Sequence, residues 1–248
     1  MRLAGKTAIV TGGGSGFGAG IARKFAAEGA WVLIADRDRA AGEAIAASLG
    51  DMARSMEVDV TVDGEVAALV ESAFVEFGGL DILVNNAGIG HGPQPMEALD
   101  ERLFDRIAEV NMKAIYLTAR HVVPRFKQAK AGVILNMAST AGVSPRPNLT
   151  WYNASKGWVI TATRSMAAEL APHGIRVNAL NPVAGETPLL KTFMGGDTPE
   201  MRAKFLASIP LGRFSTPADM GNAAAFLCSE EASMITGVAL EVDGGRCI

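Results

Sequence analysis

The sequence predicts an α/β protein in which helices cover both faces of a doubly wound, mostly parallel sheet of seven strands. Short runs rich in Val, Ile and Leu alternate with longer amphipathic stretches, and these runs are nearly continuous in apolar residues. Such runs suit strands that are buried on both faces, and the alternation implies right-handed crossover connections. No linker, low-complexity tract or internal repeat divides the 248 residues, so we expect one domain spanning 1–248.

The expected strands and helices alternate along the chain. Seven runs have the composition of strands: Lys6–Thr11, Trp31–Asp36, Met56–Val60, Leu80–Asn86, Gly132–Ser139, Ile175–Pro182 and Gly237–Gly245. Apolar residues recur with helical spacing in Gly18–Glu28, Arg39–Leu49, Gly64–Phe77, Glu101–Lys127, Tyr152–Leu170 and Pro217–Cys228. Residues 183–210 follow the sixth strand and are rich in Pro and Gly, so they are expected to form an inserted substrate loop or lid, with a structural loop containing a short helix as the alternative.

Composition and charge exclude several classes of function. The net charge of −3 and the absence of a basic run give no support for nucleic-acid binding. No stretch is apolar enough to span a membrane, and the first residues lack the features of a signal peptide, so a cytoplasmic protein is expected. Cys228 and Cys247 form neither a disulfide framework nor a metal-binding spacing, and no metal site is predicted.

The segment Val10–Gly20, VTGGGSGFGAG, joins the first strand to the first helix. Glycines permit a tight turn whose backbone N–H groups approach a phosphate, and a helix N-terminus adds a favourable dipole. The residues Gly14-x-Gly16-x-x-Ala19 also fit the dinucleotide-binding pattern. Two alternatives fail: Gly5-Lys6-Thr7 has no upstream Gly for a phosphate loop, and a nucleophile elbow around Ser15 needs Gly where Phe17 stands.

Asp36 ends the second strand about twenty residues after the glycine turn, where a carboxylate can accept hydrogen bonds from an adenosine ribose. The same charge would repel a 2′-phosphate, which favours NAD(H) over NADP(H). Arg37 is the competing feature, because a guanidinium can bind that phosphate. No basic residue in the glycine turn assists Arg37, so Asp36 carries more weight.

Tyr152 and Lys156 are four residues apart at a predicted helix start and therefore lie on one helix face. A phenol titrates near pH 10, and a shift of about 3 units requires roughly 4 kcal/mol of differential interaction with a neighbouring charge. The alternative interpretation is an amphipathic helix with a packed Tyr and a solvated Lys. Ser139 ends the fifth strand, where parallel sheets bind ligands, and can hold a substrate oxygen.

These motifs together resemble the short-chain dehydrogenase/reductase family over essentially the whole chain, in its single-domain form with a Rossmann-like fold. The matching residues are Thr11-Gly12-x-x-x-Gly16-x-Gly18, Asp59-Val60, Asn85-Asn86-Ala87-Gly88, Asn111, Ser139, Tyr152-x-x-x-Lys156, Asn181-Pro182, Thr187 and the terminal VDGG. The similarity extends to 3-oxoacyl-ACP reductases and to sugar and polyol dehydrogenases. It implies an NAD(P)-dependent enzyme that interconverts a secondary alcohol and a ketone.

The resemblance also implies the role of each site residue. Tyr152 is the general acid/base, Ser139 positions the substrate oxygen, Lys156 tunes Tyr152 and binds the nicotinamide ribose, and Asn111 holds a water in a proton relay. The expected cofactor-binding residues are Gly12, Ser15, Gly16, Phe17, Gly18, Asp36, Arg37, Asp59, Val60, Asn86, Tyr152, Lys156, Pro182, Gly185 and Thr187.

One stretch departs from the family pattern. The family usually has Asn-Pro-Gly after the sixth strand, whereas this chain has Asn181-Pro182-Val183, and Gly185 stands where Val or Ile is common. A backbone contact to the nicotinamide amide survives a change of side chain, so cofactor binding is still expected. The geometry of the loop and the substrate-facing wall are the features that this departure affects.

Substrate choice is expected to lie in residues that follow strand ends or occupy the inserted segment: His91, Gln94, Thr140, Asn148, Trp151, Leu189, Phe193 and Met194. Trp151 suggests an apolar wall, and His91 is either a substrate contact or an ordinary loop residue. A 3-oxoacyl thioester, a sugar or polyol, and a small cyclic alcohol all remain open. The resemblance implies a homotetramer. A non-catalytic NAD-sensing module is the alternative function, and a hydrolase has no Ser-His-acid order in its favour.

Overall fold

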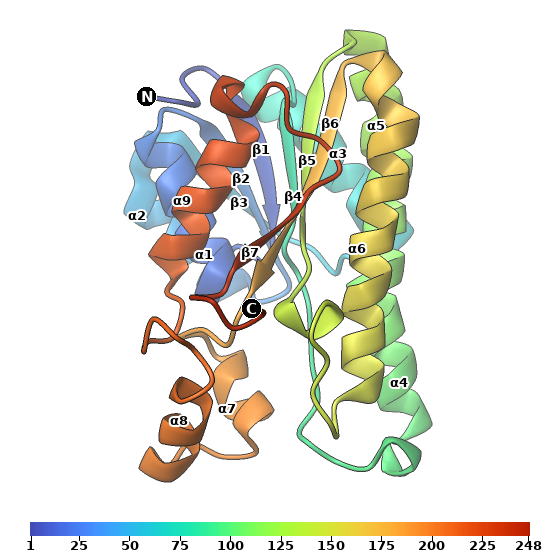
Figure 1. Cartoon of the computed structure of the whole chain (residues 1–248). Coiled ribbons are helices and arrows are strands. Elements are labelled where there is room, and N and C mark those ends of the chain that lie inside the picture. Colours follow the sequence, from blue (N-terminus) through green and yellow to red (C-terminus); the bar gives the residue numbers. More distant parts are fainter.

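The computed structural model describes residues 1–248 and contains a seven-stranded sheet with the strand order β3-β2-β1-β4-β5-β6-β7 (Figure 1). Every strand pairing is parallel, which confirms the predicted doubly wound sheet. The strands are β1 Thr7–Thr11, β2 Trp31–Asp36, β3 Ala53–Glu57, β4 Ile82–Asn85, β5 Gly132–Met137, β6 Ile175–Pro182 and β7 Ala239–Val242.

Helices cover both faces of this sheet (Figure 1). They are α1 Gly16–Ala27, α2 Arg39–Leu49, α3 Asp63–Phe77, α4 Glu101–Ala108, α5 Ala114–Ala129, α6 Thr150–Leu170, α7 Leu189–Met194, α8 Pro199–Leu206 and α9 Pro217–Cys228. The apolar core is correspondingly split in two. Ala8 and Val10 of β1 pack with α1, α2 and α9, whereas Ile9 between them packs with α3, α5 and α6. Alternate residues of one strand thus supply both layers. No helix is both long and apolar enough to cross a membrane.

The chain order reverses at β1, which has β2 on one side and β4 on the other. Crossovers on opposite faces leave a crevice at such a point, outside the carboxyl ends of the strands. The glycine turn after β1, the segment after β4, Ser139 after β5 and Val183 after β6 all follow strand ends at this edge. The topology therefore brings the predicted site residues together.

The third strand lies earlier in the chain than predicted. The sequence prediction placed it at Met56–Val60, but β3 spans Ala53–Glu57 because Val32 to Asp36 of β2 pair with these residues. Val58 and Val60 are buried just beyond the strand end. Their apolar side chains produced the strand-like pattern, although they line the crevice edge rather than continue the sheet.

The predicted long helix Glu101–Lys127 is helical throughout but contains a π-helical turn at Glu109–Lys113 between α4 and α5. Such a turn carries one extra residue and often occurs at functional positions. Asn111 lies in this turn and is almost fully buried. Sequence periodicity indicated the helix but not this local widening.

The inserted segment 183–210 forms two short helices, α7 and α8, rather than one. They lie beyond the carboxyl edge of the sheet (Figure 1). Val183, Leu190, Met194, Ile209 and Phe214 form a small apolar cluster of their own, separate from the two main core layers. The segment is thus held largely by its own side chains.

Helices α1 and α9 approach each other at two glycines. A Cβ on Gly20 would collide with the carbonyl of Pro217, and a Cβ on Gly221 would lie 2.7 Å from the Gly20 oxygen. Because interiors are close-packed, even one added methyl group must push the helices apart. This contact fixes the helix whose N-terminus faces the crevice.

We expect Gly20→Ala to lower the free energy of unfolding by about 1–3 kcal/mol, since the methyl group overpacks the α1–α9 contact. Chemical denaturation measures this change. Gly64→Ala is the matched control, because nothing lies within 4 Å of its Cβ position and Ala favours a helix over Gly. Equal stability changes for the two variants would contradict the packing argument.

Candidate active site

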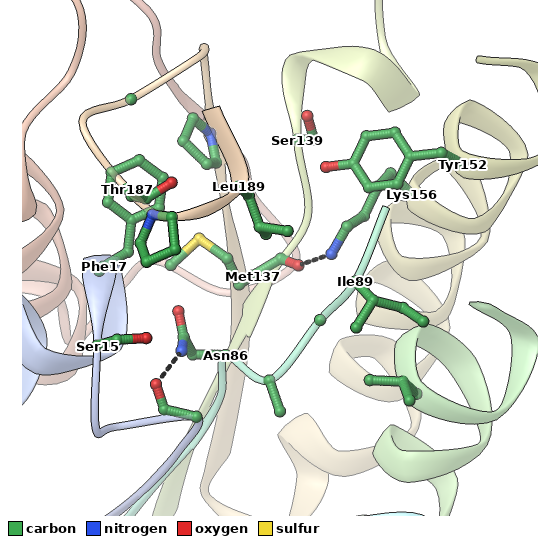
Figure 2. A pocket seen from close by; sticks show the side chains of 18 of the residues that line it. Ser15, Phe17, Asn86, Ile89, Met137, Ser139, Tyr152, Lys156, Thr187 and Leu189 are labelled. Atoms are coloured by element: carbon green, nitrogen blue, oxygen red, sulfur yellow. Dashed lines mark hydrogen bonds between the residues drawn. The ribbon is translucent and has the colours of Figure 1, made fainter. Parts of the chain in front are cut away.

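A cavity of about 340 Å³ runs along the carboxyl edge of the sheet between the glycine turn and the start of α6. Figure 2 shows Ser15, Phe17, Asn86 and Thr187 on one side, with Ser139, Tyr152 and Lys156 on the other. Every residue predicted to bind the cofactor lines this cavity except Gly18. Of the four predicted catalytic residues, Asn111 lies just outside the lining.

The floor of the cavity is held by Thr11 at the end of β1. Its hydroxyl donates to the Val84 carbonyl at 3.2 Å and accepts the backbone N–H groups of Asn86 at 3.0 Å and Ala87 at 3.1 Å. The Asn86 amide in turn donates to the carbonyl oxygens of Thr11 at 2.9 Å and Gly12 at 3.0 Å. These bonds join the β1 and β4 ends across the crevice.

The glycine turn needs its glycines for space as well as for conformation. Gly12 and Gly16 have φ of +61° and +50°, a region that L side chains rarely adopt. A Cβ on Gly18 would collide with the Gly12 carbonyl, so Gly18 shapes the turn from outside the cavity. Helix α1 then begins at Gly16 with Ser15 as N-cap and no acidic residue in its first turn, which suits a phosphate group.

The structure explains the unusual Gly185. The Phe17 ring occupies the space that a side chain at 185 would fill, so a Val or Ile there would collide with it. Thr187 approaches the other side of the turn, since its Cβ lies 3.2 Å from the position of a Cβ on Gly16. Phe17, in the first turn of α1, and Gly185, in the segment after β6, are therefore complementary, since the ring leaves no space for a side chain at position 185.

Asp36 faces the glycine turn from the end of β2. Its carboxylate accepts hydrogen bonds from the backbone N–H groups of Gly14 at 2.9 Å and Asp38 at 3.0 Å. Arg37 follows it, is exposed and lines the same end of the cavity. The carboxylate is thus held in place by the backbone, whereas the guanidinium forms no ion pair.

Asp59 and Val60 line the cavity beyond β3, as predicted. The Asp59 carboxylate pairs with Arg106 at 3.0 Å and accepts two hydrogen bonds from Thr61. Burial raises the pKa of Asp59, but the bonds from Thr61 and Arg106 outweigh it and hold the pKa below its ordinary value. Arg106, from α4, was not identified by sequence reasoning.

The hydroxyl groups of Tyr152 and Ser139 point toward each other (Figure 2). Tyr152 is almost completely buried, and the Phe193 ring lies against it with 4.7 Å between centroids. Burial raises the pKa of Tyr152 above its ordinary value, although its interaction with Ser139 and the charge of Arg146 act to lower it. In this environment the phenol is protonated at neutral pH.

Lys156 lies one helical turn after Tyr152 and is also buried. Its ammonium donates a hydrogen bond to the Met137 carbonyl at 2.8 Å and lies 5.9 Å from the centroid of the Tyr152 ring. Burial lowers the pKa of Lys156 to about 8. The ammonium is therefore near the phenol without pointing at its oxygen, and it is not among the groups that shift the pKa of Tyr152 in this structure.

Asn111 is held by bonds from both ends of its side-chain amide. Its oxygen accepts the Ile89 N–H at 2.9 Å, and its NH2 group donates to the Ile89 carbonyl and to the Ser155 hydroxyl, both at 3.0 Å. A Cβ on Gly88 would lie 3.4 Å from both the Asn111 oxygen and the Lys156 nitrogen. Asn111 and Lys156 thus border the same small space beside Gly88.

The residues predicted to choose the substrate divide into two groups. Thr140, Leu189 and Phe193 line the cavity, whereas His91, Gln94, Asn148, Trp151 and Met194 do not. Trp151 was expected to form an apolar wall, but its ring packs edge-on against Phe104 and donates a hydrogen bond to the Met96 carbonyl. On a helix, adjacent residues point about 100° apart, so Trp151 faces away from Tyr152.

His91 is buried and points inward to the loop rather than to the cavity, with its Nδ1 bonded to the Gly92 carbonyl at 2.8 Å. Conversely, several lining residues were not identified from the sequence: Arg106, Val110, Arg146, Ala184 and Leu190. Val183, whose departure from the family pattern was expected to affect the substrate-facing wall, also lines the cavity. Arg146 had one usable signal, because it lies six residues before Tyr152 in a loop that follows a strand end.

The residues present fit a dinucleotide. The glycine turn and the start of α1 suit a pyrophosphate, Asp36 suits a ribose, and Val58 and Val60 offer apolar surface at the same end. A Cβ on Gly12 would lie 3.0 Å from Asn86 and Ala87, so the backbone at this point is bare only because the residue is glycine.

Comparison with known proteins agrees with this geometry. The family model described as enoyl-(acyl carrier protein) reductase matches residues 12–246. The chain belongs to the short-chain dehydrogenase/reductase family. It is 48% identical over 252 residues to 4-formylbenzenesulfonate dehydrogenase of Comamonas testosteroni, with both chains fully covered. It is 40% identical to galactitol 2-dehydrogenase of Agrobacterium fabrum, with 99% of each chain covered.

Solved structures show the same similarity. A 3-ketoacyl-(acyl-carrier-protein) reductase from Brucella melitensis complexed with NADH is 55% identical, with a TM-score of 0.94 and coverage of 99% of this chain and 100% of that chain. An NAD⁺-bound xylitol dehydrogenase is 30% identical, with a TM-score of 0.92 and the same coverage. As a member of this family, the protein is an NAD(P)-dependent oxidoreductase that acts on CH–OH groups.

We expect Lys156→Met to stabilise the fold near neutral pH, since it removes a buried charge. Because its pKa is lowered, Lys156 loses its proton at a lower pH in the folded protein than in the unfolded chain. The loss of stability caused by the buried charge is therefore complete below a pH of about 8 and disappears as pH rises toward 10.5. The difference in unfolding free energy should therefore shrink over that range by an amount on the order of 3 kcal/mol.

Chemical denaturation of both proteins at a series of pH values measures this difference. Lys204→Met is the matched control, because Lys204 is exposed on α8 and forms no ion pair. If the difference in unfolding free energy between wild type and Lys156→Met did not change with pH, the assigned burial of the ammonium would be contradicted.

Proposed function

We propose that this protein interconverts a secondary alcohol and the corresponding ketone with NAD(H), using Tyr152 as general acid/base. The observation that carries the proposal is the convergence of Ser139, Tyr152 and Lys156 on one wall of a cavity whose other wall is the glycine turn. A phenol, a hydroxyl group and an ammonium beside a dinucleotide cradle suit proton transfer coupled to hydride transfer.

Tyr152 and Ser139 bind the substrate oxygen between them. For ketone reduction, the phenol donates its proton to the oxygen as negative charge develops there, and Ser139 donates a hydrogen bond to the same atom. The raised pKa of Tyr152 keeps this proton in place at neutral pH. For alcohol oxidation the phenol must first lose its proton, so oxidation is favoured at higher pH.

Lys156 and Asn111 assist this proton transfer. The buried ammonium stabilises negative charge on the phenol, because Coulomb interactions are strong where water is excluded. The small space bordered by Lys156, Asn111 and Gly88 suits a water that carries the proton onward. Asn111 has one oxygen lone pair left for it, since its NH2 group is already bonded to Ile89 and Ser155.

Residues of the glycine turn, Asp36, Asn86, Pro182, Gly185 and Thr187 hold the dinucleotide, and Asp59 and Val60 contact its adenine. When bound, the nicotinamide supplies or accepts the hydride. The NADH complex of the Brucella melitensis relative and the NAD⁺ complex of the xylitol dehydrogenase support the use of NAD(H). Asp36 supports it further, since its carboxylate is fixed by two backbone N–H groups where a 2′-phosphate would approach.

The substrate end of the cavity favours a body with apolar surface. Val183, Leu189, Leu190 and Phe193 line it, in addition to the polar side chains of Ser139, Thr140, Arg146, Tyr152 and Lys156. The relatives are named for an aryl aldehyde that carries a sulfonate, a polyol and a ketoacyl thioester of acyl carrier protein. The last two belong to the substrate classes that the sequence left open, and the aryl aldehyde is a class outside them. The lining favours a cyclic or aryl-bearing alcohol over a sugar, whose many hydroxyl groups require polar partners.

We also propose assembly as a homotetramer through α4, α5 and α6. Phe104, Tyr116 and Trp158 lie on these helices and expose 43%, 58% and 37% of their surface. Large exposed apolar side chains on long neighbouring helices suit a symmetric interface between identical chains.

We expect Tyr152→Phe to lower kcat for alcohol oxidation by about 10²–10⁴-fold, because it deletes the acid/base while preserving the ring. A panel of cyclic and aryl secondary alcohols with NAD⁺, followed by NADH absorbance, measures turnover. The affinity for NAD⁺ and the thermal stability should change little, which separates catalysis from folding. Full turnover in Tyr152→Phe would eliminate the proposed role.

We expect the wild type to prefer NAD⁺ to NADP⁺, and Asp36→Asn to narrow this preference by about tenfold through loss of one repelling charge. Asparagine has one acceptor oxygen, so it can keep the hydrogen bond from the Gly14 N–H but loses the bond from the Asp38 N–H. Initial rates with each coenzyme provide the ratio, and Arg37→Gln tests the competing guanidinium. A stronger NADP⁺ reaction in the wild type would reverse the assignment.

A further inference from the structure

Arg146 lines the cavity on the Tyr152 side, although it belongs to the loop between β5 and α6. The loop is well fixed at this point: Pro145 and Pro147 flank the residue, and its carbonyl accepts a hydrogen bond from the Asn153 amide at 2.8 Å. Arg146 is therefore held next to the first turn of α6, which carries Tyr152. The backbone of the loop therefore fixes the position of this residue.

Charges in the cavity are segregated between its two ends. Both lining carboxylates, Asp36 and Asp59, lie beyond β2 and β3 at the end that suits the adenosine, and Asp59 is already paired with Arg106. At the Tyr152 end the charged lining residues are Arg146 and Lys156, and no carboxylate faces them. The substrate end thus presents only positive charge.

The Arg146 guanidinium has no anionic partner in the protein. It forms no ion pair, and it donates no hydrogen bond to a protein acceptor. Burial lowers the pKa of Arg146, and the positive charge of a second guanidinium, that of Arg246, lowers it further. Its face lies over the Phe205 ring from α8, 4.5 Å from the centroid. Stacking of this kind covers the face of the guanidinium but leaves its in-plane N–H donors free.

A partly buried guanidinium without a partner is unfavourable, because it has lost water and gained no counter-ion. An anionic ligand group would supply the missing acceptors, and the planar fork matches a carboxylate or sulfonate through two parallel hydrogen bonds. Val183, Leu190 and Phe193 line the same cavity as Arg146 and the reacting hydroxyl pair, and they give it apolar surface. The complementary ligand has an oxidisable carbon at one end, an apolar body and an anion at the other.

We propose that Arg146 is a specificity-determining residue that binds the carboxylate or sulfonate of the substrate, so that the enzyme acts on secondary alcohols and ketones bearing such an anion on an apolar ring. This inference rests on the proposed dehydrogenase function. The reaction itself remains the oxidation of the alcohol by NAD⁺, which gives the ketone, NADH and a proton, and the anionic group takes no covalent part.

Three matched probes test the proposal: 4-(1-hydroxyethyl)benzoate, the corresponding sulfonate and the neutral carboxamide, which share one ring and one reacting alcohol. In the wild type we expect kcat/KM to be about 10- to 100-fold higher for the two anions than for the carboxamide. Arg146→Gln should remove this preference by raising KM for the anions alone, whereas any fall in kcat, which follows because the guanidinium also lowers the pKa of Tyr152, should be equal for all three probes. Arg146→Lys should retain part of it, since the charge remains but the fork is lost.

The neutral carboxamide separates recognition from structure, because Arg146 also stacks on α8. If Arg146→Gln raised KM equally for all three probes, the residue would act by holding α8, and the proposal would be overturned. Arg246→Gln is the control variant, since Arg246 does not line the cavity, and it should keep the preference for anions. Loss of the preference in Arg246→Gln but not in Arg146→Gln would likewise refute the assignment to Arg146.

A binding measurement keeps this test independent of turnover. The ketone 4-acetylbenzoate cannot react with NAD⁺, so its affinity for the NAD⁺-loaded protein can be measured by calorimetry. We expect Arg146→Gln to weaken that affinity about 10- to 100-fold while the affinity for NAD⁺ alone is unchanged. Absence of turnover with every probe, together with intact and Arg146-dependent ketone binding, would contradict the proposed function but not the anion site. Equal affinities in wild type and variant would overturn the anion site alone.

Discussion

The rest of the site depends on the hydrogen bonds that the hydroxyl group of Thr11 forms. Two parallel strands that run apart toward different helices leave their last peptide groups without ladder partners. Thr11 bonds to Val84, Asn86 and Ala87 from one buried oxygen, and so joins the strands where the backbone ladder stops. The glycine turn and the Asn86 segment can then separate around a ligand without leaving buried polar groups unsatisfied.

Burial gives the other end of the cavity its chemistry. Tyr152 and Lys156 are both shielded from water, and this shielding disfavours the charged form of each: the pKa rises for the phenol and falls for the ammonium. The two shifts reverse the small difference between these side chains in water, so that in the folded protein the ammonium loses its proton at a lower pH than the phenol does. Because burial alone moves the pKa of the phenol away from neutrality, proton exchange at Tyr152 depends on the interaction with Ser139 and the charge of Arg146, which act to lower that pKa.

Sequence reasoning identified the parts of the molecule that obey local rules. Glycines with positive φ, an acidic residue at the end of a strand and a Tyr–Lys pair at helical spacing each require particular residue types, so they can be seen in one sequence. The strand order and the shared edge follow from the alternation of elements and the handedness of crossovers.

The remaining features depend on contacts between distant segments. Val58 and Val60 have strand-like patterning but lie past β3 because pairing with β2 sets the register. Trp151 is adjacent to Tyr152 in sequence, yet the helix turns it toward Phe104. Arg146 carries no motif, and its importance arises from what is missing around it in space. The fit of the Phe17 ring against Gly185 likewise becomes visible only when the start of α1 meets the segment after β6.

The small apolar cluster formed by Val183, Leu190, Met194, Ile209 and Phe214 has an evolutionary consequence. Because Val183 and Leu190 line the cavity and pack with Met194, Ile209 and Phe214, mutations within this cluster change the cavity wall while the layers on the sheet keep their packing. New substrate preferences can therefore be acquired there at little risk to folding. A fold that keeps its coenzyme site constant while one separately packed segment varies in sequence can give rise to many related enzymes with different substrates.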